Sequence, residues 1–267
     1  MDKIGLIAGA GKFPFLFSHA AKQQGIFVVA FAFKKITDKR LKKYVDRIFW
    51  LDIGRLGELL EALKQNRIKK AVMAGKIPKA FLFNSHLEKD EESNSFLNKV
   101  SDKGDASLLT AVADKLKQQG VQLLDSTTFL SHLLPSKGTF TRREPSDLEW
   151  EDIHFGKELA KRMGDLDIGQ TVLVKNKVVL AIEAIEGTDA AIKRGGKLGN
   201  RGAVAVKMSR PVQDMRFDVP VVGPETVRTL IKAKFAVLAV EAKKSIIIDR
   251  EEVVKLANRK GIAIVAV

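Results

Sequence analysis

Short apolar segments alternate with amphipathic helical segments along the first half of this chain, and this alternation is the feature that most constrains its fold. Five strands are predicted by apolar runs at residues 4–8, 26–33, 47–53, 70–75 and 121–126. Helices are predicted by the spacing of apolar residues at 13–25, 55–67 and 105–120. The run IFVVAFAF is almost wholly apolar, as in parallel strands covered on both faces. We therefore predict an α/β fold with a Rossmann-like, mostly parallel sheet in an N-terminal domain, residues 1–134.

A second α/β domain with a mixed sheet is predicted for residues 135–267, after a linker at 133–140 that contains Pro, Ser and Gly. Ser146 with Glu149 three residues later predicts the capped start of a long helix. Two strands around a tight turn near Asn176 are predicted at 170–187. Further helices are expected at 188–194, 223–235 and 250–261, and further strands at 202–208, 236–242, 245–249 and 262–267. Hairpins together with crossovers indicate a mixed sheet.

The charge balance favours an anionic partner, because 46 lysines and arginines stand against 32 acidic residues, a formal net charge of +14. Such a surplus attracts nucleic acid, an acidic membrane surface or phosphorylated metabolites. With one Tyr, two Trp and no zinc-finger or RNA-recognition motif, we expect no nucleic acid partner.

The absence of Cys excludes disulfides and thiolate metal sites. No apolar stretch reaches the roughly 18 residues of a membrane span, so we expect a cytoplasmic protein.

Two loops repeat one pattern: AGKFP at 10–14 follows the first predicted strand, and AGKIP at 74–78 follows the fourth. In the usual strand order of this fold, those two strands are neighbours at the switch point where ligands bind. Backbone amides of residues 9–11 at a helix N-terminus suit a phosphate, and Lys12 and Lys76 add positive charge. An anion site and simple tight turns are equally good interpretations of these loops.

The first loop lacks the features of known dinucleotide and P-loop sites. Pro14 stands where the pattern G-x-G-x-x-G has its third glycine. Lys34 and Lys35 follow the second strand, where an acidic residue would bind the ribose of NAD. These lysines leave an NADP-dependent oxidoreductase as the dinucleotide-binding alternative. The Walker pattern fails because Phe13 replaces its Ser or Thr.

Carboxylates next to apolar runs gather in the second half, and they are Asp165, Asp167, Glu183, Glu186, Asp189, Asp214 and Asp218. Acidic residues at strand ends commonly hold Mg²⁺, with water and phosphate completing the shell. Structural roles compete with this interpretation, since Thr188 and Asp189 would cap a helix and Asp165 and Asp167 would form a turn. We favour function for the set, because Asp218 lies within the apolar segment MRFDVPVV, where an unpaired acid is costly.

Six segments together carry a family resemblance: GLIAGAGKFP, AGKIPK, SDKGDASLL, DIGQTVLVKNKVVLAIEAIEGTDAAIKR, VKMSRPVQDMRFDVPVVGPETV and SIIIDREEVVKLA. The chain resembles the UDP-2,3-diacylglucosamine pyrophosphatase family, of the magnesium-dependent type with a Rossmann-like N-terminal domain. This resemblance implies hydrolysis of UDP-2,3-diacylglucosamine to 2,3-diacylglucosamine 1-phosphate (lipid X) and UMP in lipid A biosynthesis. It also implies a homodimer that works peripherally at the cytosolic face of the inner membrane.

The resemblance also implies the site residues. The family's essential aspartate lies in an R-x-D-x-P-x-x-G motif, here RFDVPVVG, so Asp218 is expected to activate water or to bind metal. The segment EGTD adds Glu186 and Asp189 as catalytic residues, with Asp189 and Asp218 holding Mg²⁺. Substrate-binding residues are expected at Gly9, Gly11, Lys12, Gly75, Lys76, Asp105, Gln170, Thr188 and Lys207. A non-catalytic nucleotide-binding module is a second alternative.

Overall fold

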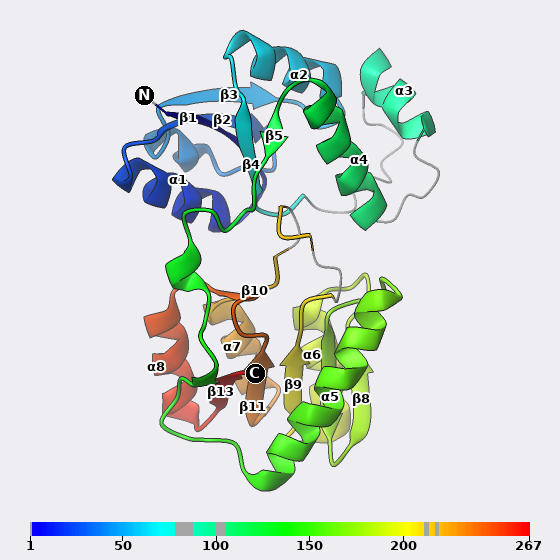
Figure 1. Cartoon of the computed structure of the whole chain (residues 1–267). Coiled ribbons are helices and arrows are strands. Elements are labelled where there is room, and N and C mark those ends of the chain that lie inside the picture. The colour runs from blue at the N-terminus through cyan, green and yellow to red at the C-terminus, as the bar shows by residue number, and fades with distance from the viewer. Residues whose placement is uncertain (1, 78–87, 100–104, 211–213, 217–218) are drawn as a thin grey trace. The chain divides into compact units, whose positions relative to one another are not determined.

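The computed structural model of the chain describes residues 2–77, 88–99, 105–210, 214–216 and 219–267 (Figure 1). The chain divides into two compact units. Unit 1 consists of Met1–Ser131 and Met215–Phe217, and unit 2 consists of His132–Asp214 and Asp218–Val267. Two segments of the chain therefore make up each unit.

Unit 1 contains a five-stranded parallel sheet with the strand order β3-β2-β1-β4-β5. Its elements are β1 (Lys3–Ala8), α1 (Phe13–Gln23), β2 (Phe27–Phe33), the 3-10 helix η1 (Lys39–Lys43), β3 (Arg47–Leu51), α2 (Leu56–Gln65), β4 (Lys70–Ala74), α3 (Glu91–Lys99), α4 (Asp105–Gln118) and β5 (Gln122–Leu123). This confirms the predicted Rossmann-like sheet and places the switch point between β1 and β4. The fifth strand is shorter than the predicted 121–126.

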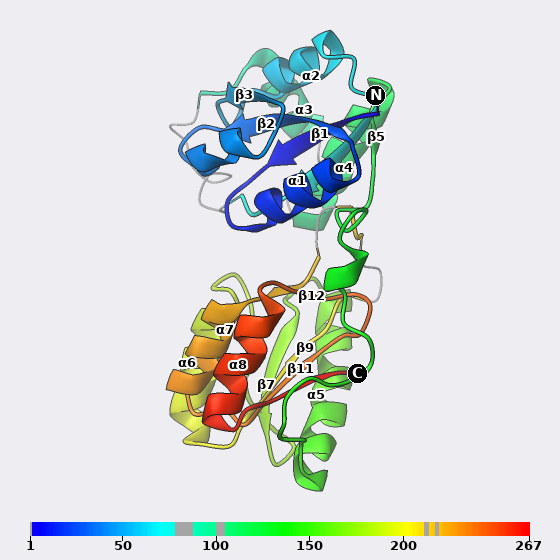
Figure 2. The same cartoon turned by 90° about the vertical axis from the view of Figure 1, so that its left-hand side faces the viewer.

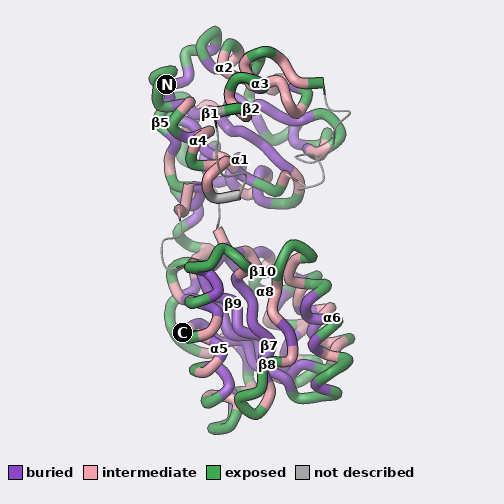
Figure 3. Tube along the Cα trace, turned by 90° about the vertical axis from the view of Figure 1, so that its right-hand side faces the viewer, coloured by how far each residue is buried: buried purple, intermediate pink, exposed green. Residues whose placement is uncertain are grey.

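The core of unit 1 lies on both faces of its sheet. Leu59 and Leu63 of α2 pack in one cluster with Leu116 of α4 and with Val29 and Phe31 of β2. Side chains of successive strand residues point to opposite faces, so the alternate residues of β2 face away from this cluster. Residues 28–33 are all buried, as Figure 3 shows for the strands, which confirms the expectation from the run IFVVAFAF.

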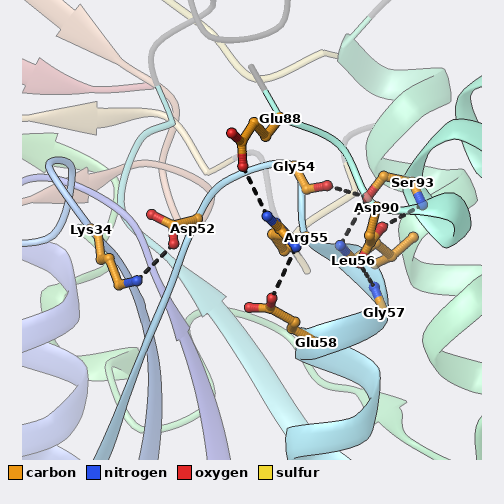
Figure 4. A network of polar contacts seen from close by, with 10 residues as sticks. All are labelled: Lys34, Asp52, Gly54, Arg55, Leu56, Gly57, Glu58, Glu88, Asp90 and Ser93. Carbon is orange, nitrogen blue, oxygen red and sulfur yellow. Dashed lines mark hydrogen bonds and ion pairs between the residues drawn. The ribbon is translucent and has the colours of Figure 1, made fainter. Parts of the chain in front are cut away.

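Helix α3 is absent from the sequence prediction, because its residues EESNSFLNK offer little apolar periodicity. Its start is instead fixed by hydrogen bonds to the start of α2 (Figure 4). The Asp90 carboxylate accepts from the amides of Gly57 at 2.8 Å and Ser93 at 2.7 Å. The Ser93 hydroxyl accepts from the Leu56 amide at 2.9 Å and donates to the Gly54 carbonyl. Asp90 therefore caps two helices at once.

An Asp90→Ala variant is expected to lower the free energy of unfolding of unit 1 by about 2 kcal/mol, roughly 1 kcal/mol for each lost cap. Burial alone would raise the pKa of Asp90, but hydrogen bonds from Ser93, Gly57 and Glu58 outweigh it and lower that pKa. Urea unfolding followed by Trp50 fluorescence in a Trp150→Phe background measures the effect, since Trp50 lies in β3 of unit 1. A change as small as that of an exposed control, Glu61→Ala, would contradict the double cap.

Unit 2 contains a six-stranded mixed sheet with the order β6-β13-β11-β9-β7-β8. Its elements are the 3-10 helix η3 (Ser131–Leu133), which leads into it, β6 (Gly138–Thr139), α5 (Asp147–Asp165), β7 (Thr171–Lys175), β8 (Val178–Ile182), α6 (Thr188–Gly199), β9 (Val204–Lys207), β10 (Val221–Val222), α7 (Pro224–Lys232), β11 (Val237–Val240), β12 (Ile246–Ile247), α8 (Arg250–Lys260) and β13 (Ala263–Ala266). Strands β9, β11 and β13 are parallel, whereas β6, β7 and β8 run antiparallel to their neighbours. Strands β10 and β12 form a separate parallel pair. The mixed sheet is thereby confirmed.

The helices of unit 2 cover the two faces of its sheet unequally. Helices α6, α7 and α8 lie side by side on one face, and α5 lies on the other (Figure 2). Ile192 of α6 and Leu230 of α7 belong to the first core cluster, and Ile153 of α5 belongs to the second. Within the described ranges, no helix combines the length and the apolar character needed to cross a bilayer.

Two local predictions for unit 2 are confirmed. Ser146 and Glu149 form a complete capping box at the start of α5. The turn between β7 and β8 places Asn176 and Lys177 at φ angles of 50° and 57°, the left-handed conformation that such a hairpin turn requires.

Two other predictions for unit 2 are wrong in part. The expected linker at 133–140 contains β6, which pairs with β13, and the amide of Lys243 donates to the Pro135 carbonyl at 2.8 Å. Helix α6 continues past residue 194 to Gly199 although glycine disfavours helices. A Cβ on Gly195 would lie 2.7 Å from Leu173 Cδ1, so packing against β7 requires that glycine.

Candidate active site

The two loops that share the Ala-Gly-Lys pattern lie side by side at the carboxyl ends of β1 and β4, as predicted. The Gly9 amide donates to the Ala74 carbonyl at 2.8 Å. Ala10 and Lys76 then exchange two backbone hydrogen bonds, of 2.8 and 3.0 Å. The repeat in the sequence therefore corresponds to two loops that are hydrogen-bonded to each other at the switch point of unit 1.

Glycine is required where these loops touch. A Cβ on Gly9 would lie 2.7 Å from the Lys76 carbonyl oxygen, and one on Gly75 would lie 2.6 Å from the Ala10 carbonyl oxygen. Gly75 also has a φ of +92°, which favours glycine. Gly11 has a φ of +95° with open space around it. Gly9 and Gly75 thus serve the backbone, which supports the tight-turn interpretation for those two residues, whereas Gly11 leaves room for a ligand.

Lys12 is the N-cap residue of α1, and Pro14 lies in the first helical turn as predicted. It borders a depression of about 330 Å³ that is also lined by Phe15, Leu16, His19, Arg40 and Tyr44. The Lys34 ammonium, which the NADP alternative would need, forms an ion pair with Asp52 at 2.7 Å (Figure 4). Its charge is therefore already balanced within unit 1.

Lys207, the last residue of β9, holds its ammonium in a polar cluster of unit 2. Its Nζ donates to Thr188 Oγ1 at 2.8 Å and lies 3.3 Å from Thr171 Oγ1 and 3.4 Å from Glu183 Oε2. Thr188 Oγ1 also donates to Glu183 Oε1 at 2.7 Å. Lys207 is only 7% exposed and the Glu183 side chain 13%. The cluster is a buried ion pair shared by two hydroxyls at the carboxyl edge of the parallel strands.

The ionisation of Glu183 is set by this cluster. Burial alone would raise the pKa of Glu183, but the charge of Lys207 and side-chain hydrogen bonds from Thr171, Thr188 and Lys207 outweigh it. The pKa of Glu183 therefore lies below its ordinary value, and the carboxylate stays ionised beside the ammonium.

The acidic residues of the segment EGTD take different positions. Glu186 is exposed and pairs with Arg194 at 2.7 Å, which holds the pKa of Glu186 below its ordinary value. Asp189 lies exposed in the first turn of α6. The expected cap is wrong for Thr188, whose hydroxyl bonds to Glu183 and Lys207, while Gly187 occupies the N-cap position without a side-chain bond. The structure thus brings Thr188 and Lys207 together.

A second buried carboxylate lies on the neighbouring strand at the same edge. Glu241 follows β11, and its Oε2 accepts from the amide of Ser209 at 2.9 Å and from the Ser209 hydroxyl. Burial alone would raise the pKa of Glu241, but the Ser209 hydrogen bonds and the nearby Lys244 and Lys161 lower it. These bonds join the segments that follow β9 and β11.

The remaining predicted site residues are placed as follows. Gln170 is buried before β7, and its carbonyl accepts from the Met208 amide at 3.0 Å. Asp105 is the first residue of α4. Asp218 lies outside the described residues. Asp167 turns the chain after α5 with a φ of 54° and pairs with Arg210 at 2.6 Å.

Among the residues described, no three His, Cys, Asp or Glu side chains gather as a metal site would require.

Thr171 and Glu241 were not predicted as members of this edge, and the pairing of Glu183 with Lys207 was not predicted either. Glu183 was among the carboxylates considered, but nothing in its spacing indicates that it pairs with a lysine 24 residues away. For Glu241 a signal existed, since a single acid in the apolar run AVLAVEA needs a partner if it is buried.

Both units are α/β, and each gathers polar groups at the carboxyl ends of parallel strands, the edge where proteins of this class bind ligands. The chain is thus a two-unit α/β protein with polar groups at the carboxyl edge of a parallel sheet region in each unit. The model of the LpxI N-terminal domain matches residues 3–133, and that of the LpxI C-terminal domain matches residues 136–265. The chain belongs to the LpxI family.

One curated relative matches the chain over its full length. It is the UDP-2,3-diacylglucosamine pyrophosphatase LpxI of Caulobacter vibrioides, 28% identical over 278 residues that cover 100% of this chain and 98% of the relative. Among solved structures, phosphoribosylglycinamide synthetase of Anaerococcus prevotii is 13% identical, with a TM-score of 0.28, over 75% of this chain and 43% of that one. Pyruvate carboxylase of Rhizobium etli is 14% identical, with a TM-score of 0.28, over 68% and 16%. These two structural similarities are too weak to carry an argument.

Proposed function

We propose that the chain hydrolyses the diphosphate of UDP-2,3-diacylglucosamine and releases 2,3-diacylglucosamine 1-phosphate and UMP in lipid A biosynthesis. The observation that carries this proposal is the match to both LpxI domains over residues 3–133 and 136–265. The full-length relative named for that activity supports it. The glycine loops of unit 1 and the Lys207 cluster of unit 2 add two sites whose chemistry suits anionic groups.

The Lys207 cluster suggests how unit 2 contributes. The three contacts of the Lys207 ammonium match its three N–H donors, two of them long at 3.3 and 3.4 Å. A diphosphate oxygen that binds Lys207 would replace one of these two contacts. Glu183 then acts as a positioning residue, because it holds both Lys207 and Thr188 at the edge where the substrate charge must be neutralised.

We propose Mg²⁺ as the cofactor, held by Asp218 and Asp189 together with substrate oxygens. The residues that the structure describes do not form a complete metal site, so the proposal depends on Asp218. Its support is the exposed carboxylate of Asp189, which directly follows the Thr188 of the Lys207 cluster. Bound Mg²⁺ would neutralise charge on the diphosphate. Asp218 would either bind the metal or accept a proton from the attacking water.

We also propose that the enzyme acts as a homodimer at the cytosolic face of the inner membrane. The family resemblance supports this arrangement, and the two acyl chains of the proposed substrate place that substrate in a membrane. The formal charge of +14 favours an acidic lipid surface. Sedimentation of the purified protein alone measures its oligomeric state, and a monomer at all concentrations would refute the homodimer.

Release of UMP tests the function. The purified protein with UDP-2,3-diacylglucosamine and Mg²⁺ is expected to release UMP, and excess EDTA is expected to abolish the release until Mg²⁺ is restored. Asp218→Ala is expected to be inactive, whereas Asp165→Ala, an exposed acid at the end of α5, serves as its matched control. No UMP release by the wild type would refute the function, and an undiminished rate in EDTA would refute the cofactor.

A further inference from the structure

A basic groove lies on the surface of unit 2, between α8 and the segment that follows β6. Its volume is about 750 Å³. Four cationic side chains line it, those of Arg142, Arg250, Lys255 and Arg259, with Glu251 as the one acid in the lining. None of these residues belongs to the Lys207 cluster or to the glycine loops. The groove is therefore lined by residues to which the proposed hydrolysis assigns no role.

The walls of the groove are held together by specific contacts. The Arg142 amide donates to Asn258 Oδ1 at 2.8 Å, which ties the first wall to α8. The Arg250 guanidinium lies 4.4 Å from the centre of the Phe140 ring. Phe140 and Thr141 are in turn bonded to Ile264 of the sheet at 2.9 Å each. These bonds fix the backbone that carries the cations, so the groove exists without a ligand.

The charges in the groove are poorly balanced. Within the described part of the chain, the side chains of Arg142, Lys255 and Arg259 form no ion pair. The nearby Glu252 is engaged in an ion pair with Arg228 of α7. Like charges held on a fixed surface repel one another, and an anion that enters the groove removes this repulsion.

We propose that this groove is a second anion site, which binds a multiply charged phosphate group. Arginine presents a planar fork of donors that matches phosphate oxygens, and two of the cations lie on one row of α8 at a spacing of four residues, Lys255 and Arg259. The Phe140 ring lies against the Arg250 guanidinium and holds that side chain in place. The phosphate comes either from a soluble diphosphate or from anionic lipid headgroups.

The test compares two double variants that change the net charge equally. Lys255→Glu/Arg259→Glu alters the groove, and Lys193→Glu/Lys197→Glu alters two exposed lysines of α6 as the control. Binding of sodium pyrophosphate is measured by titration calorimetry at constant ionic strength. Each lost charged contact is expected to weaken binding about tenfold, so the groove variant should bind about 100-fold more weakly than the control. Binding at the proposed active site remains as an unchanged event in both titrations, so the 100-fold weakening is expected only for the binding event of the groove.

A second arm identifies the source of the phosphate. The same two variants are sedimented with vesicles of phosphatidylglycerol or of phosphatidylcholine. Retention of the control, but not of the groove variant, on phosphatidylglycerol alone assigns the groove to lipid headgroups. A difference seen only with pyrophosphate assigns it to a soluble ligand.

The proposal is overturned if both variants bind pyrophosphate and anionic vesicles equally, or if both lose binding equally, since either result would mean that net charge alone decides. Unchanged melting temperatures of the two unliganded variants show that both are folded. Amide shift mapping of the wild type with pyrophosphate gives a readout without mutation, and shifts at residues 140–142 and in α8 are expected.

Discussion

A Glu183→Ala variant is expected to lower the free energy of unfolding of unit 2 by about 3 kcal/mol. The substitution leaves the Lys207 ammonium buried at 7% exposure with two neutral hydroxyls as its only partners from the cluster. Loss of one partner of a buried ion pair is costly because the other charge stays out of water. Trp150 lies in α5 of unit 2, so its fluorescence in a Trp50→Phe background reports urea unfolding of that unit.

Two controls distinguish this effect from a general loss of charge. Glu186→Ala removes the exposed ion pair with Arg194 and is expected to cost less than about 1 kcal/mol. The double variant Glu183→Ala/Lys207→Met is expected to recover most of the lost stability, because it removes the buried charge as well. A double variant no more stable than Glu183→Ala would contradict the ion pair as the cause.

The same pair predicts a pH dependence. The pKa of Glu183 in the folded state lies below its ordinary value of 4.5, so the unfolded state takes up its proton first as the pH falls. The stability that the pair contributes is therefore complete above that ordinary value and is lost as the pH falls through the lowered pKa. The stability difference between wild type and Glu183→Gln should shrink below pH 4.5, measured as the difference between two urea midpoints. A difference that grows on acidification would refute this assignment.

Gly75→Ala is expected to destabilise unit 1 by about 3 kcal/mol, from two causes acting together. The left-handed φ of +92° costs roughly 1–2 kcal/mol with a side chain, and the new Cβ would lie 2.6 Å from the Ala10 carbonyl oxygen. The two loops would have to separate and lose the paired bonds between Ala10 and Lys76. Trp50 fluorescence in the Trp150→Phe background follows the unfolding.

Gly11→Ala is the matched control for this prediction. Its φ of +95° gives the same backbone strain, but no atom lies within 4 Å of the added Cβ. Its expected cost is only about 1 kcal/mol, and the difference between the two variants isolates the collision between the loops. Equal costs would show that backbone strain alone explains the glycine in AGKIP.

The sheet of unit 1 was predictable from sequence because its information is local. Continuous apolar runs mark the buried strands, and the two loops of the repeat follow strands that this fold places next to each other. Helix α3 was missed because Asp90 and Ser93, which start it, bond to residues more than 30 positions away. Strand β6 was missed because two residues, Gly138 and Thr139, carry no periodicity and pair only where β13 offers them an edge.

The candidate site was less predictable than the fold for the same physical reason. The role of Thr188 depends on whether its hydroxyl meets a local amide or a distant lysine, and both fit its position before a helix. The pairing of Glu183 with Lys207 follows from the antiparallel register that sets Thr171 opposite Lys207, which composition does not encode. The prediction of Asp218 rests on the family motif and on the position of this acid in the apolar segment MRFDVPVV.

The division of the chain into units has a consequence for its modularity. The short segment Met215–Phe217 belongs to unit 1, whereas the segments before and after it in the chain belong to unit 2. The amide of Ser126 donates to the Met215 carbonyl at 2.9 Å, and the Ser126 hydroxyl bonds to the carbonyls of Arg216 and Met73. An N-terminal fragment that ends between the two halves would lack Met215 and Arg216. The buried Ser126 would then lose two of its hydrogen bonds. The two halves of the chain are therefore not independent modules. Recombination between relatives should preserve all three points at which the chain passes from one unit to the other.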